Sequence, residues 1–76
     1  MTHSRRFNIA RGDGSPDRPI IVVNIGDLYA TLGRRFPGYQ LIQQRFEFDE
    51  HGRKVDLMSI RTAEGSLETI HFRYIE

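Results

Sequence analysis

The chain contains no cysteine among its 76 residues. A disulfide framework and a thiolate metal site are both excluded, and apolar packing alone must hold the fold together. The absence of cysteine fits a reducing compartment.

Long apolar runs are also missing from the sequence. No stretch approaches the ~18–20 apolar residues that a helix needs to cross a bilayer. The first residues, from Met1 to Phe7, lack the apolar segment of a secretory signal. We therefore expect a cytoplasmic protein that makes no membrane contact.

Lysine is scarce and the net charge is close to zero, at +1. Lys54 is the only lysine, and every other basic residue is an arginine. Arginine suits bidentate recognition of phosphate and carboxylate, so an arginine-rich surface is one explanation. Codon bias in a GC-rich genome is the other. The first half of the chain is slightly basic and the second half slightly acidic.

Three strands are predicted in the second half, from Gln40 to Asp49, from Lys54 to Thr62 and from Leu67 to Glu76. In the last of them Ile70, Phe72 and Tyr74 alternate with polar residues, as the two-residue period of a half-buried strand requires. Glycine-containing turns separate the three strands. The pattern is typical of an antiparallel meander.

Two further strands are predicted in the first half. The segment from Arg5 to Ala10 alternates, and residues 11–18 after it have the Gly, Ser, Pro and Asp content of a flexible loop. The run from Pro19 to Ile25 is apolar on both parities, which is typical of a strand covered on both faces. We expect this run to be the central strand, and residues 1–4 to be disordered.

One helix is predicted between these strands and the meander. Asn24 or Asp27 can act as its N-cap, and Leu28, Leu32 and Phe36 follow at helical spacing. Pro37 and Gly38 then end the helix.

The turns indicate how the meander strands pair. A three-residue loop at 64–66, with Gly65 at positive φ, places Ile60 opposite Ile70. A two-residue turn at His51 and Gly52 places Phe48 opposite Val55 and Phe46 opposite Leu57. The second strand is then apolar on both parities. Either a β-bulge near Leu57 and Met58 resolves this conflict, or Leu41, Val55 and Leu57 form a second apolar patch on the outer face.

The predicted fold is a single α+β domain, 1–76, with the order β-β-α-β-β-β. It has an antiparallel sheet of four to five strands and one helix packed across one face. We expect the core to contain Phe7, Ile9, Ile21, Val23, Leu28, Leu32, Phe36, Ile42, Phe46, Phe48, Met58, Ile60, Ile70, Phe72 and Tyr74.

Catalytic and metal-binding patterns are not found in the sequence. No serine lies in a nucleophile elbow, and the glycines form neither a phosphate loop nor a dinucleotide fingerprint. The three histidines have no metal-ligand spacing. We therefore expect no catalytic residues, metal or cofactor, and a protein that is not an enzyme.

Two functional hypotheses remain. A chain of this size buries only roughly 60% of its unfolded surface and is marginally stable, so partners are common. The first hypothesis is a protein-binding or regulatory module, self-associating or bound to another protein through Leu41, Val55 and Leu57. The second is a nucleic-acid binder that uses an arginine-rich outer sheet face, formed by Arg45, Arg61, His71 and Arg73. An ordinary solvated sheet has the same composition as that face.

Overall fold

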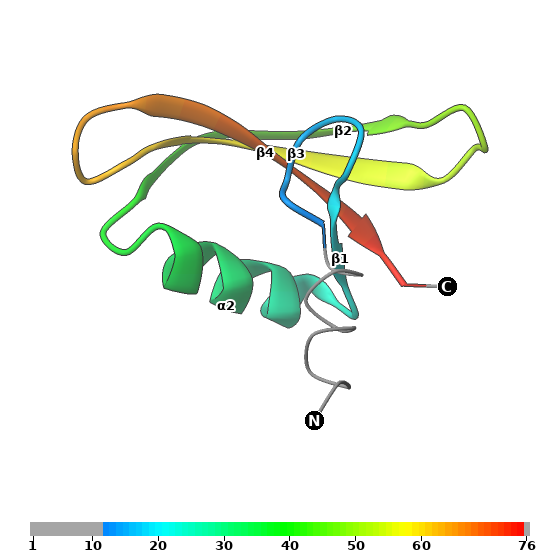
Figure 1. The fold of residues 1–76 in the computed structure, drawn as a ribbon, viewed down its shortest axis with the longest axis horizontal. Coiled ribbons are helices and arrows are strands. Elements are labelled where there is room, and N and C mark those ends of the chain that lie inside the picture. The colour runs from blue at the N-terminus through cyan, green and yellow to red at the C-terminus, as the bar shows by residue number, and fades with distance from the viewer. Residues whose placement is uncertain (1–11, 76) are drawn as a thin grey trace.

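The computed structural model describes residues 12–75 and has one helix packed against one mixed sheet (Figure 1). The elements are β1 (Ile20–Val22), α2 (Ile25–Arg35), β2 (Gln40–Phe48), β3 (Lys54–Arg61) and β4 (Leu67–Tyr74). The predicted α+β class is confirmed. The strand predicted from Arg5 to Ala10 and the disorder predicted for residues 1–4 lie outside the described residues.

The sheet has four strands in the order β1-β4-β3-β2. β3 pairs antiparallel with both β2 and β4, but β1 pairs parallel to β4, so the prediction of a purely antiparallel sheet is wrong. The prediction of a central strand from Pro19 to Ile25 is wrong as well. That strand lies at the sheet edge and is only three residues long, because the chain leaves the sheet at Val23 to enter the helix.

Helix α2 begins where the sequence indicates. The Asn24 side chain accepts a hydrogen bond from the Asp27 amide at 2.8 Å, and the Asp27 carboxylate accepts one from the Val23 amide at 3.0 Å. Asn24 is therefore the N-cap and satisfies an amide that the first turn leaves unpaired, while Asp27 binds the amide of the residue before the cap. Of the described residues, none belongs to a helix long and apolar enough to cross a membrane.

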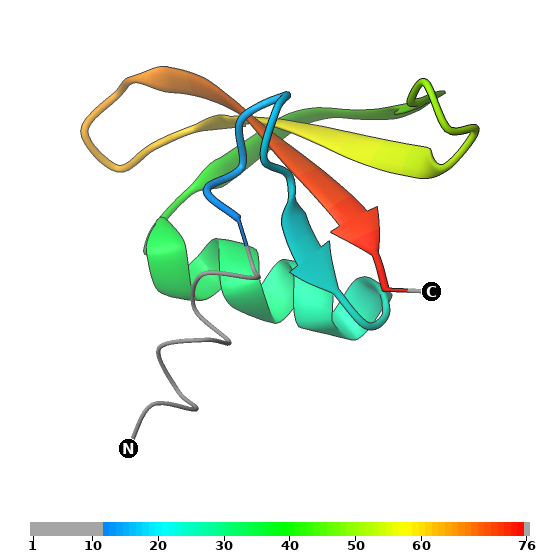
Figure 2. The same cartoon turned by 45° about the vertical axis from the view of Figure 1, so that its right-hand side comes forward.

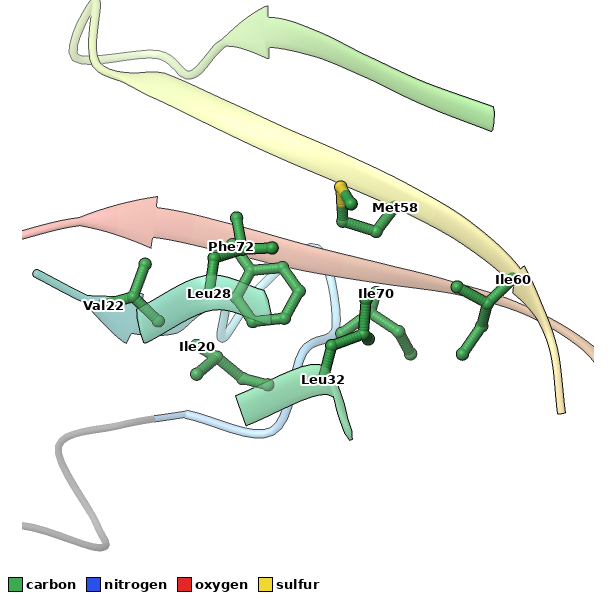
Figure 3. Packing of buried hydrophobic residues seen from close by; sticks show 8 residues of the cluster. All are labelled: Ile20, Val22, Leu28, Leu32, Met58, Ile60, Ile70 and Phe72. Atoms are coloured by element: carbon green, nitrogen blue, oxygen red, sulfur yellow. The ribbon is translucent and has the colours of Figure 1, made fainter. Parts of the chain in front are cut away.

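The core lies between α2 and the sheet face that the helix covers, called here the helix-side face. Phe72 and Ile70 point from β4 toward the helix, which contributes Leu28 and Leu32 (Figure 3). Phe72, Leu28 and Leu32 are completely buried. The remaining core residues are Ile20, Val22, Met58 and Ile60, with Tyr29, Phe36, Tyr39 and Tyr74 packed at the margin.

Several residues predicted for the core lie elsewhere. In β1 the buried residues are Ile20 and Val22, and not the predicted Ile21 and Val23. A run that is apolar at every position does not indicate which alternate side chains face inward. In β2 the predicted core residues are exposed; they are Ile42, Phe46 and Phe48. The predicted core residues Phe7 and Ile9 lie outside the described residues.

The hairpin registers differ from the predicted ones. Ile60 pairs with Glu68 and Met58 with Ile70, a shift of two residues that preserves the predicted faces. At the β2–β3 turn a three-residue loop at 50–52 replaces the predicted two-residue turn, with Gly52 at φ 76° and the Asp49 amide bonded to the Arg53 carbonyl. Phe46 therefore pairs with Asp56 instead of Leu57, since one added loop residue shifts the register by one.

The loop that precedes β1 lies along the edge of β4. The Gly14 carbonyl accepts a hydrogen bond from the His71 amide at 2.8 Å, and Gly14 is buried. A Cβ on Gly14 would lie 2.9 Å from the Ile70 side chain, so the close approach requires glycine. The flexibility expected for residues 11–18 stays a prediction.

Phe72 gives a test of this core. Replacing Phe72 by Ala should cost about 3–5 kcal/mol of unfolding free energy, because a fully buried ring leaves a cavity. Arg73→Ala removes the next side chain, which lies on the opposite face, and should change stability by less than about 0.5 kcal/mol. Urea denaturation of both variants measures the difference, and equal losses would contradict the face assignment.

Candidate protein-interaction surface

Strand β2 is the long edge of the sheet. It pairs with β3 on one side, and within residues 12–75 no strand pairs with its other side. All nine of its residues are exposed. The Asp49 amide bonds to the Arg53 carbonyl, and antiparallel hydrogen bonds alternate along a strand. The backbone N–H and C=O groups of Gln44, Phe46 and Phe48 therefore point away from β3, toward the free edge.

Two aromatic rings lie beside this edge on the helix-side face. Phe46 and Phe48 are 57% and 64% exposed and contact each other edge to face, with 5.8 Å between ring centroids. The ammonium of Lys54 lies 4.9 Å from the centroid of the Phe46 ring, in a cation–π contact. This aromatic pair is the largest apolar feature that β2 presents on the helix-side face.

The aromatic pair is uncovered because α2 does not reach it. Figures 1 and 2 show the end of the β2–β3 hairpin projecting beyond the helix, which lies beside β1 and beneath the other end of the hairpin. A hydrogen bond from the Tyr29 hydroxyl to the Gln44 side chain, 3.0 Å long, joins α2 to β2 near the middle of the strand. Beyond Gln44, toward Phe48, the helix-side face of β2 is open to solvent.

A buried carboxylate lies next to the aromatic pair. Asp56, paired with Phe46 across the strands, is only 3% exposed. Its carboxylate accepts a hydrogen bond from the Tyr74 hydroxyl at 2.8 Å and lies 3.9 Å from the Lys54 ammonium. Burial of the phenol, together with the hydrogen bond to Asp56 and the charge of Asp56, raises the pKa of Tyr74 to about 12.

The apolar patch predicted from the sequence is not formed. Val55 and Leu57 lie on the outer face, as one of the two predicted alternatives required, but they are 5% and 4% exposed. Leu41 pairs with Ile60 and so lies on the helix-side face. The bulge is in β2, between Leu41 and Gln43, and not near Leu57 and Met58. The loop before β1 lies over this part of the outer face, since Pro16 and Pro19 line the same groove as Val55.

The four residues of the nucleic-acid hypothesis do share one face. Arg45 and His71 flank Leu57 in the register, Arg73 pairs with Val55, and Arg61 lies at the far end of β3. All four therefore belong to the outer face. The Nδ1 atom of His71 lies 3.3 Å from the Gly14 carbonyl oxygen, so one of its two ring nitrogens already has a main-chain partner.

A groove of about 480 Å³ crosses the outer face between the loop before β1 and the β2–β3 turn. Its charged and titratable lining residues are Asp17, Glu47, Asp49 and Glu50 with His51, Arg53, His71 and Arg73. Asp49 accepts hydrogen bonds from the Arg53 and His51 amides, and these bonds lower its pKa. Carboxylates and basic groups are mixed throughout, so the groove carries no strong field of one sign.

Sequence reasoning missed the free edge of β2. The predicted turn set Phe46 opposite Leu57, whereas the structure places Phe46 and Phe48 on the face of Met58 and Ile60, and their exposure depends on which strand lies at the edge. Strand order was not predictable from the local pattern.

Among residues 12–75 no three His, Asp or Glu side chains lie together in a way that would hold a metal ion. Comparisons of the chain with protein-family models, with curated proteins and with solved structures give no match.

The bond between Tyr74 and Asp56 predicts a pH-dependent stability. Since the pKa of Tyr74 is raised from 10.0 to about 12, the folded protein holds its proton more tightly than the unfolded chain does. The contribution of this proton to stability is complete below pH 10 and is lost as the pH rises toward 12. Tyr74→Phe should cost about 1–3 kcal/mol at neutral pH, because it leaves a buried carboxylate without its donor. Tyr74→Phe should also abolish the part of the stability loss at alkaline pH that comes from ionisation of the Tyr74 phenol.

Urea midpoints between pH 7 and pH 12 measure both effects, with Tyr39→Phe as the control for losing a partly buried phenol. If the two variants show the same pH profile, the bond does not contribute as described.

Proposed function

We propose that this protein is a non-enzymatic protein-binding module that receives an extended segment of a partner at the free edge of β2. The observation that carries the proposal is the combination of a nine-residue edge strand, exposed throughout, with two uncovered aromatic rings beside it. Strand addition of this kind takes affinity from main-chain hydrogen bonds and specificity from alternate side chains. The cytoplasmic location expected from the sequence stays a prediction.

The hydrogen-bonding capacity of the edge supports the proposal. Gln44, Phe46 and Phe48 each offer an outward N–H and an outward C=O at regular spacing. A long, exposed edge of this kind is a template for another strand, and soluble proteins usually protect such edges with proline, short strands or inward charges. The described β2 contains no proline, and its bulge lies at Leu41–Gln43, away from the aromatic pair.

The apolar surface supports it too. An incoming strand would place alternate side chains beside Phe46 and Phe48 on the helix-side face, where removing the rings from water is favourable. Aromatic cross-strand pairs add about 0.2–1 kcal/mol each. The charged residues Arg45 and Glu47 on the outer face would select among partners.

A peptide titration tests the proposal. Isotope-labelled protein is titrated with a nine-residue peptide of alternating threonine and valine, which matches the length of β2. We expect amide shifts confined to Gln44, Phe46, Phe48 and their neighbours. The same peptide with a central proline should cause no shift, because proline removes a ladder donor.

Two pairs of variants sharpen the test. Phe46→Pro removes the ring and the outward N–H, whereas Phe46→Leu removes the ring alone; only the first should abolish binding. Phe48→Lys should weaken binding, and Leu67→Lys, at an equally exposed site on β4, should not. Shifts centred on the outer-face groove, or none at all, would contradict the proposal.

The second candidate is nucleic-acid binding by the outer face, favoured by the shared position of Arg45, Arg61, His71 and Arg73. The carboxylates in the adjoining groove weigh against it.

If the face binds a random-sequence oligonucleotide, each neutralised phosphate should contribute about −0.7 to −0.9 to the log–log salt slope. Arg45→Ala should then reduce the salt slope by the contribution of one phosphate. Arg35→Ala, which changes a residue on the helix, should leave the slope unchanged. The absence of binding at low salt would exclude this candidate.

A further inference from the structure

The free edge of β2 also has a preferred partner strand. We infer that this strand is β2 of a second copy of the chain, paired antiparallel about a two-fold axis that passes through Phe46. The inference rests on the proposed function, because it requires the edge to accept a strand. It adds the identity of the partner and the register.

The alternation of inward-pointing and outward-pointing main-chain groups along β2 permits this register. The outward groups belong to Gln44, Phe46 and Phe48. With the axis at Phe46, Phe46 lies opposite the partner's Phe46, and Gln44 lies opposite the partner's Phe48. Every outward N–H between Gln44 and Phe48 then meets an outward C=O, as a hydrogen-bonded antiparallel pair requires.

Charge complementarity selects this register from its neighbours. With the axis at Phe46, Arg45 lies opposite the partner's Glu47 on the outer face, and symmetry repeats the pair. An axis at Arg45 would set two arginines opposite each other, which is destabilising. An axis at Gln44 would pair Arg45 with the partner's Gln43 and would leave Glu47 without a basic residue opposite it. Only the axis at Phe46 pairs both charges.

The helix-side face is complementary in the same arrangement. Phe46 and Phe48 from both copies gather around the axis, where directly opposite and diagonal neighbours are within reach of aromatic side chains. The two helices lie on the same side of the joined sheet but away from the axis, since α2 does not extend under the end of the hairpin (Figures 1 and 2). The two four-stranded sheets become one continuous sheet.

A charge exchange tests the pairing. Arg45→Glu and Glu47→Arg should each raise the dimer dissociation constant about tenfold or more, because each sets like charges opposite each other twice. The double variant Arg45→Glu/Glu47→Arg should return it to within about threefold of the original. Within one chain the cross-strand neighbours of these residues are Leu57 and Val55, so the fold should tolerate the exchange. Sedimentation over a concentration series measures the constants, and circular dichroism checks folding.

The lack of cysteine permits a direct test of the register. Arg45→Cys and Glu47→Cys proteins, mixed and oxidised, should form a disulfide-linked dimer, because a directly opposite pair lies within disulfide range. Each variant oxidised alone should link poorly, since its cysteines would be offset by two residues from the symmetry position. Efficient linking of Arg45→Cys with itself would overturn the register.

The outcomes separate the two proposals. A chain that stays monomeric at millimolar concentration, yet shifts its β2 amides with the threonine–valine peptide, would overturn the dimer and leave the strand-binding function standing. A monomer with no peptide shifts would overturn both. A dimer that is indifferent to the charge exchange would overturn the inference, because the copies would then meet through another surface.

Discussion

The short length of helix α2 is the constraint on which the rest of this structure depends. An α-helix of 11 residues is about 16 Å long, whereas a strand of nine residues such as β2 extends over about 30 Å. Helix α2 therefore covers only part of the helix-side face, and the core forms beneath it from β1, β4 and β3. The helix-side face of β2 near Phe46 and Phe48 is left open.

The boundary between the covered and the open part contains a polar pair. Asp56 is buried beside the core, and the hydroxyl of Tyr74 donates to its carboxylate. A carboxylate at this depth is costly unless it is hydrogen-bonded, so Tyr74 holds it in place and also fixes the end of β4 against β3. Lys54, which lies near both Asp56 and the Phe46 ring, joins this polar pair to the aromatic surface. Hydrogen bonding and charge contacts therefore hold in place the residues on which the candidate interaction surface packs.

The two sheet faces differ in their suitability for partners. The outer face combines buried Val55 and Leu57 with a groove of mixed charge, which is the chemistry of an ordinary solvated sheet. The free edge combines unpaired main-chain groups, exposed aromatic rings and an Arg45–Glu47 alternation with internal two-fold complementarity. Main-chain pairing is directional, whereas dispersed surface charges are not, and for this reason we propose the edge, not the outer face, as the site of association.

The sequence by itself determined the local features: a helix start at Asn24 or Asp27, the Leu28–Leu32 stripe, the glycine turns and the alternation that places Phe72 inward and Arg73 outward. Each of these depends on residues only a few positions apart. Tertiary structure alone decided that β1 pairs parallel to β4, that Val55 and Leu57 are buried, and that Phe46 and Phe48 are exposed. Alternation determines which side chains share a face. What lies over that face depends on strand order and helix placement, which are set by contacts between residues distant in the chain.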